Sequence, residues 1–153
     1  DTIASNIAPG SEEINEERLA IAVEIANIKG FIESLPLRYN TKIGANGHGL
    51  SEGQKQRLLI ARVIYKNPAI IIFDEATNSL DANNEKVIVE NLSEFFKGKT
   101  VIVVAHRLST VKDADKIVVL EGGRIIESGI HESLIGKRGA YFDLVKNQLN
   151  LGN

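Results

Sequence analysis

The segment from Leu50 to Gln54, LSEGQ, combines residue types that suit an anion-binding helix start. The N-terminus of a helix leaves backbone N–H groups unpaired and carries partial positive charge, so it attracts phosphates and carboxylates. Ser51 adds a hydroxyl, and Gly53 has no Cβ to obstruct a phosphate. Ser51 and Gln54 also form a capping-box pattern, so an ordinary capped helix is the competing interpretation.

Asp74 and Glu75 follow an apolar run, Ala69 to Phe73, that is typical of a strand covered on both faces in a parallel sheet. In such sheets, ligands bind beyond the carboxyl ends of the strands. Two adjacent carboxylates could divide the work there, with Asp74 holding Mg²⁺ through water and Glu75 orienting or deprotonating a water. A carboxylate that only caps the following turn is the competing interpretation, and this segment alone favours it.

His106 follows a second apolar run, Thr100 to Ala105. If the two strands are neighbours in one parallel sheet, His106 lies at the same edge as Asp74 and Glu75. A neutral imidazole there could hydrogen-bond a phosphate or an attacking water. Asp81 precedes a predicted helix and is an obvious N-cap, a role that does not exclude a functional one.

The bulk properties are those of an ordinary globular domain. The chain has 153 residues, of which 43% are hydrophobic and 25% charged, enough for one domain with a modest core. Its formal net charge of −2 gives no indication of a nucleic-acid partner. It contains no cysteine, which excludes disulfides and thiolate metal sites. No apolar run in the sequence approaches the roughly 20 residues of a membrane-spanning helix.

These residues require a scaffold in which helices and strands alternate. Helices are predicted where apolar residues recur at helical spacing, over residues 12–29, 51–65, 83–96 and 131–149. Strands are predicted at the apolar runs and beside the Gly122-Gly123 turn, over 69–73, 100–105, 116–120 and 124–127. Glycines are expected to interrupt the helical pattern at Gly30, Gly136 and Gly139. This order predicts an α/β fold with a mainly helical part, residues 1–66, and a part built on strands, residues 67–153.

In this order and spacing, the motifs resemble those of the nucleotide-binding domain of ABC transporters over essentially the whole chain. Leu50 to Gln54 is similar to the ABC signature motif, and the strand that ends at Asp74 is similar to the Walker B strand. The resemblance implies that Glu75 is the catalytic glutamate, His106 the switch histidine and Asp81 a nucleotide-binding residue of the D-loop. It also implies ATP and Mg²⁺, with Asp74 as the water-mediated metal ligand. The implied fold is a partial P-loop-type ATPase domain, with a helical subdomain before the parallel strands and a hairpin and helices at the C-terminus.

The same resemblance implies two partner domains. In the family, two such domains enclose two ATP molecules, so Ser51, Gly53 and Gln54 would contact the ATP of a second, identical or different, nucleotide-binding domain. Thr41 to Gly47 resembles the loop that exporters place against their transmembrane domain, and Gly129 to Leu134 resembles a C-terminal segment common in exporters. The implied function is ATP hydrolysis that powers export, at the cytoplasmic face of the cell (inner) membrane, without nucleic acid.

The sequence departs from the family pattern at two positions. Glu52 stands where the signature usually has glycine, which places a carboxylate near the expected phosphate. Ala45 replaces an acidic residue that is frequent in the exporter loop. The runs Asn46 to Gly49 and Asp81 to Glu85 further resemble bacterial peptide and bacteriocin exporters, which gives the finer hypothesis.

No G-x-x-x-x-G-K-[ST] phosphate-binding loop occurs in the sequence. Because Asp1 to Ile7 resembles the segment that follows the glutamine loop, the chain is interpreted as a C-terminal fragment of the domain. Without the lysine and backbone amides of that loop, we expect the isolated fragment neither to bind ATP tightly nor to hydrolyse it. We also expect self-association, because apolar surface should be uncovered on two strands, at Ile70, Ile72, Val101 and Val103.

Three other functions are compatible with parts of the pattern. An SMC- or Rad50-like ATPase shares the signature and Walker B motifs, but flanks them with long coiled-coil heptads that this sequence lacks. A soluble ABC-type protein acting on ribosomes should be more basic and should lack the exporter-like loop and tail. The presence of Glu75 and His106 disfavours a non-catalytic domain of an asymmetric transporter. The departure from the signature at Glu52 is compatible with such a domain.

Overall fold

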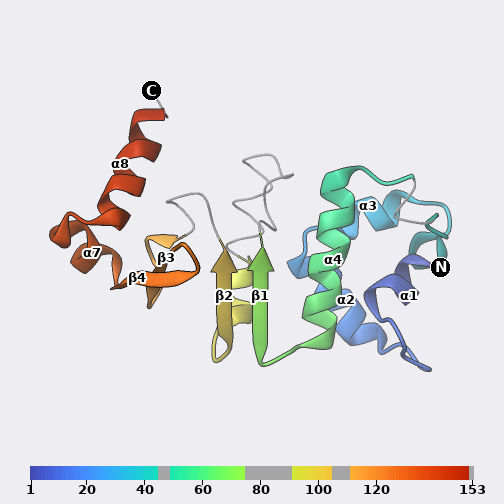
Figure 1. The fold of residues 1–153 in the computed structure, drawn as a ribbon. Helices are drawn as coiled ribbons and strands as arrows, with labels where there is room; N and C mark the ends of the chain where they lie inside the picture. Colours follow the sequence, from blue (N-terminus) through green and yellow to red (C-terminus); the bar gives the residue numbers. More distant parts are fainter. Residues whose placement is uncertain (45–48, 75–90, 105–110, 152–153) are drawn as a thin grey trace. The chain divides into compact units, whose positions relative to one another are not determined.

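A computed structural model describes residues 1–44, 49–74, 91–104 and 111–151 (Figure 1). The helices are α1 (Ile3–Ile7), α2 (Glu16–Ile25), α3 (Lys29–Ser34), η1 (Arg38–Asn40), α4 (Glu52–Lys66), α7 (His131–Lys137) and α8 (Ala140–Leu151), and residues 91–96 are also helical. The strands are β1 (Ile70–Asp74), β2 (Thr100–Val104), β3 (Ile117–Glu121) and β4 (Arg124–Gly129). No helix within these described ranges has the length and apolar character needed to cross a membrane.

The chain divides into two compact units, Asp1–Ile72 with Ala76–Ile102 and Phe73–Glu75 with Val103–Asn153. The mixed content of helices and strands agrees with the predicted α/β class. The predicted division between residues 66 and 67 stays a prediction.

The core of the first unit forms around α4. Both α1 and α2 pack against α4, as Figure 1 shows for the two blue helices beside the green one. The side chains that are completely buried in this unit are those of Ile3, Ile7, Ala22, Val23, Ala26, Ile32 and Ala61. Arg62 links α4 to α1, because its Nε donates a hydrogen bond to the carbonyl oxygen of Asn6 at 2.6 Å. Burial of these aliphatic side chains holds the signature-like helix in place.

The predicted helix over residues 12–29 is wrong in its extent. α2 begins only after Asn15, whose side-chain oxygen accepts a hydrogen bond from the Arg18 amide at 2.9 Å. It ends after Ile25, because Asn27 has a left-handed backbone with φ of 51°. α3 then begins at Lys29, so Gly30 lies inside a helix and does not interrupt one.

β1 and β2 form a two-stranded sheet, and their arrows run in the same direction in Figure 1. The amide of Thr100 donates to the carbonyl oxygen of Ala69 at 3.0 Å, which joins the two strand starts. Ile71 is buried, but Ile70 is 62% and Ile72 67% exposed. The expectation that this strand is covered on both faces is therefore wrong, whereas the expected exposure of Ile70 and Ile72 is confirmed.

On β2, Val103 is exposed as expected and Val101 is half-buried. Together with Ile70 and Ile72, Val103 adds to the exposed apolar surface of the β1–β2 pair. Self-association through this surface stays a prediction, and light scattering that shows a stable monomer would contradict it.

The second unit contains the predicted hairpin. β3 and β4 pair antiparallel across Gly122 and Gly123, whose φ values of 55° and 75° are those that a tight two-residue hairpin turn requires. The hairpin packs on α7 and α8 through a core of Ile117, Val119, Leu134, Tyr141 and Val145. The hairpin prediction is confirmed because its signal, two adjacent glycines between apolar runs, is local.

α7 and α8 replace the predicted interrupted helix. α7 continues through Gly136 and stops at Arg138, whose φ is 52°, so the interruption expected at Gly136 is wrong and the one at Gly139 is confirmed. His131 Nδ1 lies 2.8 Å from the Tyr141 hydroxyl, which joins the start of α7 to α8. Burial, with a smaller contribution from the charge of Glu132, raises the pKa of Tyr141, so this hydroxyl stays neutral at physiological pH.

The start of α8 is capped by a carboxylate from β4. The Glu127 carboxylate accepts hydrogen bonds from the amides of Ala140 at 3.1 Å and Tyr141 at 2.9 Å. A Cβ atom on Gly139 would lie 1.8 Å from Glu127 Oε1, so a side chain at this position would displace the carboxylate. Glycine therefore leaves room for the carboxylate in its capping position.

Replacing Gly139 by alanine is expected to lower the free energy of unfolding by about 1–2 kcal/mol, because both capping hydrogen bonds are lost. Glu127→Ala should have a similar effect, and the double variant should lose no more than either single one. Urea unfolding measures all three, with Glu121→Ala, an exposed position on the same hairpin, as the control. Additive losses would show that Gly139 and Glu127 act independently.

Candidate functional site

The first turn of α4 holds the three signature-like residues Ser51, Gly53 and Gln54. Ser51 is exposed, and its hydroxyl oxygen accepts a hydrogen bond from the Gln54 amide at 3.2 Å. The Gln54 side-chain oxygen accepts one from the Ser51 amide at 2.9 Å, which completes the predicted capping box. The Ser51 hydroxyl accepts in this arrangement, so its hydrogen can still be donated to an outside acceptor such as a phosphate oxygen.

Backbone donors lie beside the Ser51 hydroxyl. The Lys55 amide bonds to the Ser51 carbonyl at 2.9 Å, so the first intrahelical bond is in place. The amides of Glu52 and Gly53 precede it and have no acceptor within the helix. Arg57 stabilises this turn, because its Nε donates a hydrogen bond to the Gly53 carbonyl oxygen at 3.2 Å. Its Nη1 donates to the Asn27 carbonyl oxygen at 3.4 Å, which links the turn to the residues after α2. The helix start is therefore both ordered and able to receive an anion.

Glu52, the residue that departs from the family pattern, is paired with a lysine. Its Oε1 lies 2.6 Å from Lys55 Nζ, one helical turn further along. The Glu52 side chain is 74% exposed and that of Lys55 31% exposed. This pairing offsets much of the carboxylate's charge next to Ser51, although an exposed pair of this kind adds little to stability. Opposite charges three residues apart on a helix are the ordinary sequence signal of such a pair, and this signal was not among the predictions.

Asp74 is the last residue of β1, and its side chain is exposed. β2 ends at Val104, two positions before His106 in the sequence. Because the strands run in parallel, Asp74 and Val104 lie at the same edge of the β1–β2 pair. Glu75, Asp81 and His106 lie outside the residues that the structure describes, so their placement stays a prediction.

The start of the exporter-like loop is hydrogen-bonded to the first residues of the chain. The Ile3 amide donates to the Thr41 carbonyl at 2.9 Å, and the Ile43 amide donates to the Asp1 carbonyl at 2.8 Å. These bonds form an antiparallel bridge between Thr2 and Lys42. This contact could not be predicted from the sequence, because the two segments are distant along the chain. Ala45 lies in the part of the loop that the structure does not describe.

Comparisons with known proteins concern the family of this chain. The family model described as ABC transporter matches residues 2–78. The ATP-dependent lipid A-core flippase of Saccharophagus degradans is 49% identical over 150 residues, which are 98% of this chain and 26% of the flippase. ABC transporter B family member 14 of Arabidopsis thaliana is 48% identical over 147 residues, 96% of this chain and 12% of that protein.

A solved structure, that of a bacterial Atm1-family ABC exporter with ATP bound, is similar with a TM-score of 0.90 and 42% sequence identity. The similarity covers 97% of this chain and 26% of that one, so the chain spans about a quarter or less of the length of these relatives. It matches a part of the nucleotide-binding domain of ABC exporters, which confirms the predicted fold class and family. The chain belongs to the ABC transporter family.

Proposed function

We propose that this chain is part of an ATP-hydrolysing domain that powers export across a membrane, acting at the cytoplasmic face of the cell (inner) membrane. The observation that carries the proposal is the exposed, capped start of α4, where the Ser51 hydroxyl lies beside two backbone amides that have no acceptor within the helix. Asp74 at the end of β1 supports the second part of the proposed site, in which a carboxylate holds Mg²⁺ through water. The exporter of similar structure has ATP bound, which supports the same nucleotide here.

ATP hydrolysis in such a site depends on positioning and on neutralisation of phosphate charge. Mg²⁺ would supply positive charge at the phosphates, and the exposed Asp74 carboxylate fits the oxygen ligands that this ion prefers, through a bound water. Glu75 orients the attacking water and accepts its proton, while His106 hydrogen-bonds the terminal phosphate. Asp81 contributes to the same nucleotide region.

Ser51 and Gly53 act on the ATP of a second nucleotide-binding domain, which is either identical or different. Gln54 assists by holding Ser51 in the orientation that the capping box fixes. A transmembrane domain is the other partner, and the loop that begins at Thr41 is the segment proposed to contact it. The bridge between Thr2 and Lys42 would transmit movement of that loop to the start of this chain. The finer assignment to peptide or bacteriocin export stays a prediction.

Calorimetry with Mg-ATP tests the proposal at two levels. This chain alone is expected to show no saturable binding at micromolar ATP, because no phosphate-binding loop occurs in its sequence. The complete protein that contains the chain is expected to bind ATP and to hydrolyse it only when Mg²⁺ is present. Absence of hydrolysis by the complete protein would contradict the proposed function. Saturable micromolar binding by the chain alone would contradict only the expectation that tight ATP binding needs a phosphate-binding loop.

A further inference from the structure

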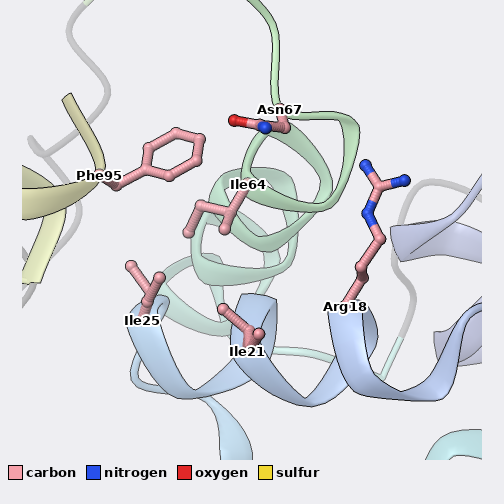
Figure 2. A pocket seen from close by; sticks show the side chains of 6 residues that line it. All are labelled: Arg18, Ile21, Ile25, Ile64, Asn67 and Phe95. Atoms are coloured by element: carbon pink, nitrogen blue, oxygen red, sulfur yellow. The ribbon is translucent and has the colours of Figure 1, made fainter. Parts of the chain in front are cut away.

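We propose that the first unit contains a second ligand site, for a small amphipathic anion such as a medium-chain carboxylate. The site is a cavity of about 240 Å³ between α2, the C-terminal end of α4 and the helical residues 91–96. Its lining residues are Arg18, Ile21, Ile25, Ile64, Asn67 and Phe95 (Figure 2). The proposal does not depend on the nucleotide site, because none of these residues belongs to it.

One part of the cavity is apolar. Figure 2 shows Ile21 and Ile25 projecting from α2 toward Ile64 of α4, with the Phe95 ring on the other side of the space. Ile21 and Ile25 are four residues apart and so lie on one face of α2. Ile64 is buried, but Ile21 is 50% exposed, so this face is only partly covered. A hydrocarbon tail in the cavity would remove that apolar surface from water.

Arg18 lines the cavity, and Lys99 lies beside it, in contact with the lining residues Asn67 and Phe95. Arg18 Nη2 donates to the Tyr65 carbonyl at 2.5 Å, and the guanidinium carbon lies 5.1 Å from the centre of the Tyr65 ring. Lys99 Nζ donates to Asn67 Oδ1 at 2.8 Å and lies 4.9 Å from the centre of the Phe95 ring. Within the part of the chain that the structure describes, neither cation has a carboxylate partner within 4.0 Å. Arg18 and Lys99 therefore keep both their charge and further N–H donors for a ligand.

The chemistry of the cavity favours one class of occupant. A neutral apolar ligand would leave two cations beside it without a counter-ion. An inorganic anion would leave Ile21 and Ile25 in contact with water. A carboxylate with an apolar tail satisfies both, because its head can hydrogen-bond Arg18 or Lys99 while its tail contacts Ile21 and Ile64. The volume equals that of about eight water molecules, which suits a tail of medium length.

Ligand-observed saturation-transfer NMR with octanoate on the whole chain tests the proposal, and this method tolerates association of the protein. Octanoate is expected to bind with a Kd of about 1 mM, the value typical of so small a ligand. Arg18→Ala should weaken binding about fivefold or more, because it removes a charge-assisted hydrogen bond. Lys99→Ala should also weaken it, because it removes a positive charge beside the cavity. Lys97→Ala is the matched control, since Lys97 lies two residues from Lys99 but pairs with Glu94.

Ile21→Glu offers an independent variant, because it puts a carboxylate at an exposed position on the cavity wall. This substitution should abolish octanoate binding while circular dichroism stays unchanged, and it covers the case in which loss of Arg18 disturbs folding. Octanol that binds as tightly as octanoate would overturn the proposal. So would unchanged octanoate affinity in Lys99→Ala and Ile21→Glu.

Discussion

Replacing Glu75 by glutamine in the complete transporter is expected to lower ATP hydrolysis at least about 100-fold. The amide keeps the size of the side chain but cannot accept a proton from the attacking water, and loss of a general base has effects of this order. ATP binding should persist, because Asp74 and the phosphate-binding groups are unchanged. Phosphate release measures the first effect, and filter binding of labelled ATP measures the second.

The matched control for this substitution is Glu94→Gln. Glu94 is an exposed carboxylate that pairs with Lys97 at 2.6 Å and belongs to no part of the proposed site. Its replacement should leave hydrolysis within about twofold of the wild type, as for most exposed substitutions away from a site. Full hydrolysis by the Glu75→Gln protein would remove Glu75 from the mechanism.

Replacing Ser51 by aspartate should separate the two roles of this residue. Aspartate is as good an N-cap as serine, so it should still accept the hydrogen bond from the Gln54 amide and keep the helix stable. Its charge, however, would oppose a phosphate at the same place. Two like charges 4 Å apart near a protein surface repel by about 4 kcal/mol, so hydrolysis should fall at least about 100-fold. Urea unfolding and phosphate release measure the two effects.

Ser51→Ala provides the comparison. It removes the hydroxyl altogether, so it should lower the free energy of unfolding by about 1 kcal/mol as well as reduce hydrolysis. If Ser51→Asp retained wild-type hydrolysis, the hydroxyl would be a cap only, and the competing interpretation of this segment as an ordinary capped helix would stand.

Features set by neighbouring residues could be predicted from the sequence. The start of α4 at Ser51 and the turn at Gly122-Gly123 each depend on a few adjacent residues, and both are as expected. The end of α2 could not be predicted, because it depends on the left-handed backbone of Asn27. Neither a glycine nor a proline stands at this position to indicate the end of the helix. The cap of α8 by Glu127 was missed for another reason, since it joins a strand to a helix through tertiary contact.

The same distinction holds for the candidate sites. Ser51, Gly53 and Gln54 are consecutive on one helical turn, so their shared location follows from the sequence alone. The shared edge of Asp74 and His106 required the assumption that two strands are parallel neighbours. The pairing of β1 with β2 supports that assumption up to Asp74 and Val104. The cavity beside Ile21 was not predictable, because its lining comes from three segments that only the folded chain brings together.

The central claim is that Ser51 acts on the nucleotide of the opposite subunit, whereas Glu75 acts on that of its own. Single-turnover ATP hydrolysis by mixed dimers of the complete transporter tests it most directly. With Ser51→Asp in one subunit and Glu75→Gln in the other, one site keeps both groups and should hydrolyse its ATP. With both substitutions in the same subunit beside a wild-type partner, each site loses one group and hydrolysis should disappear. The reverse pattern, hydrolysis only in the second dimer, would show that Ser51 serves its own subunit and would contradict the account.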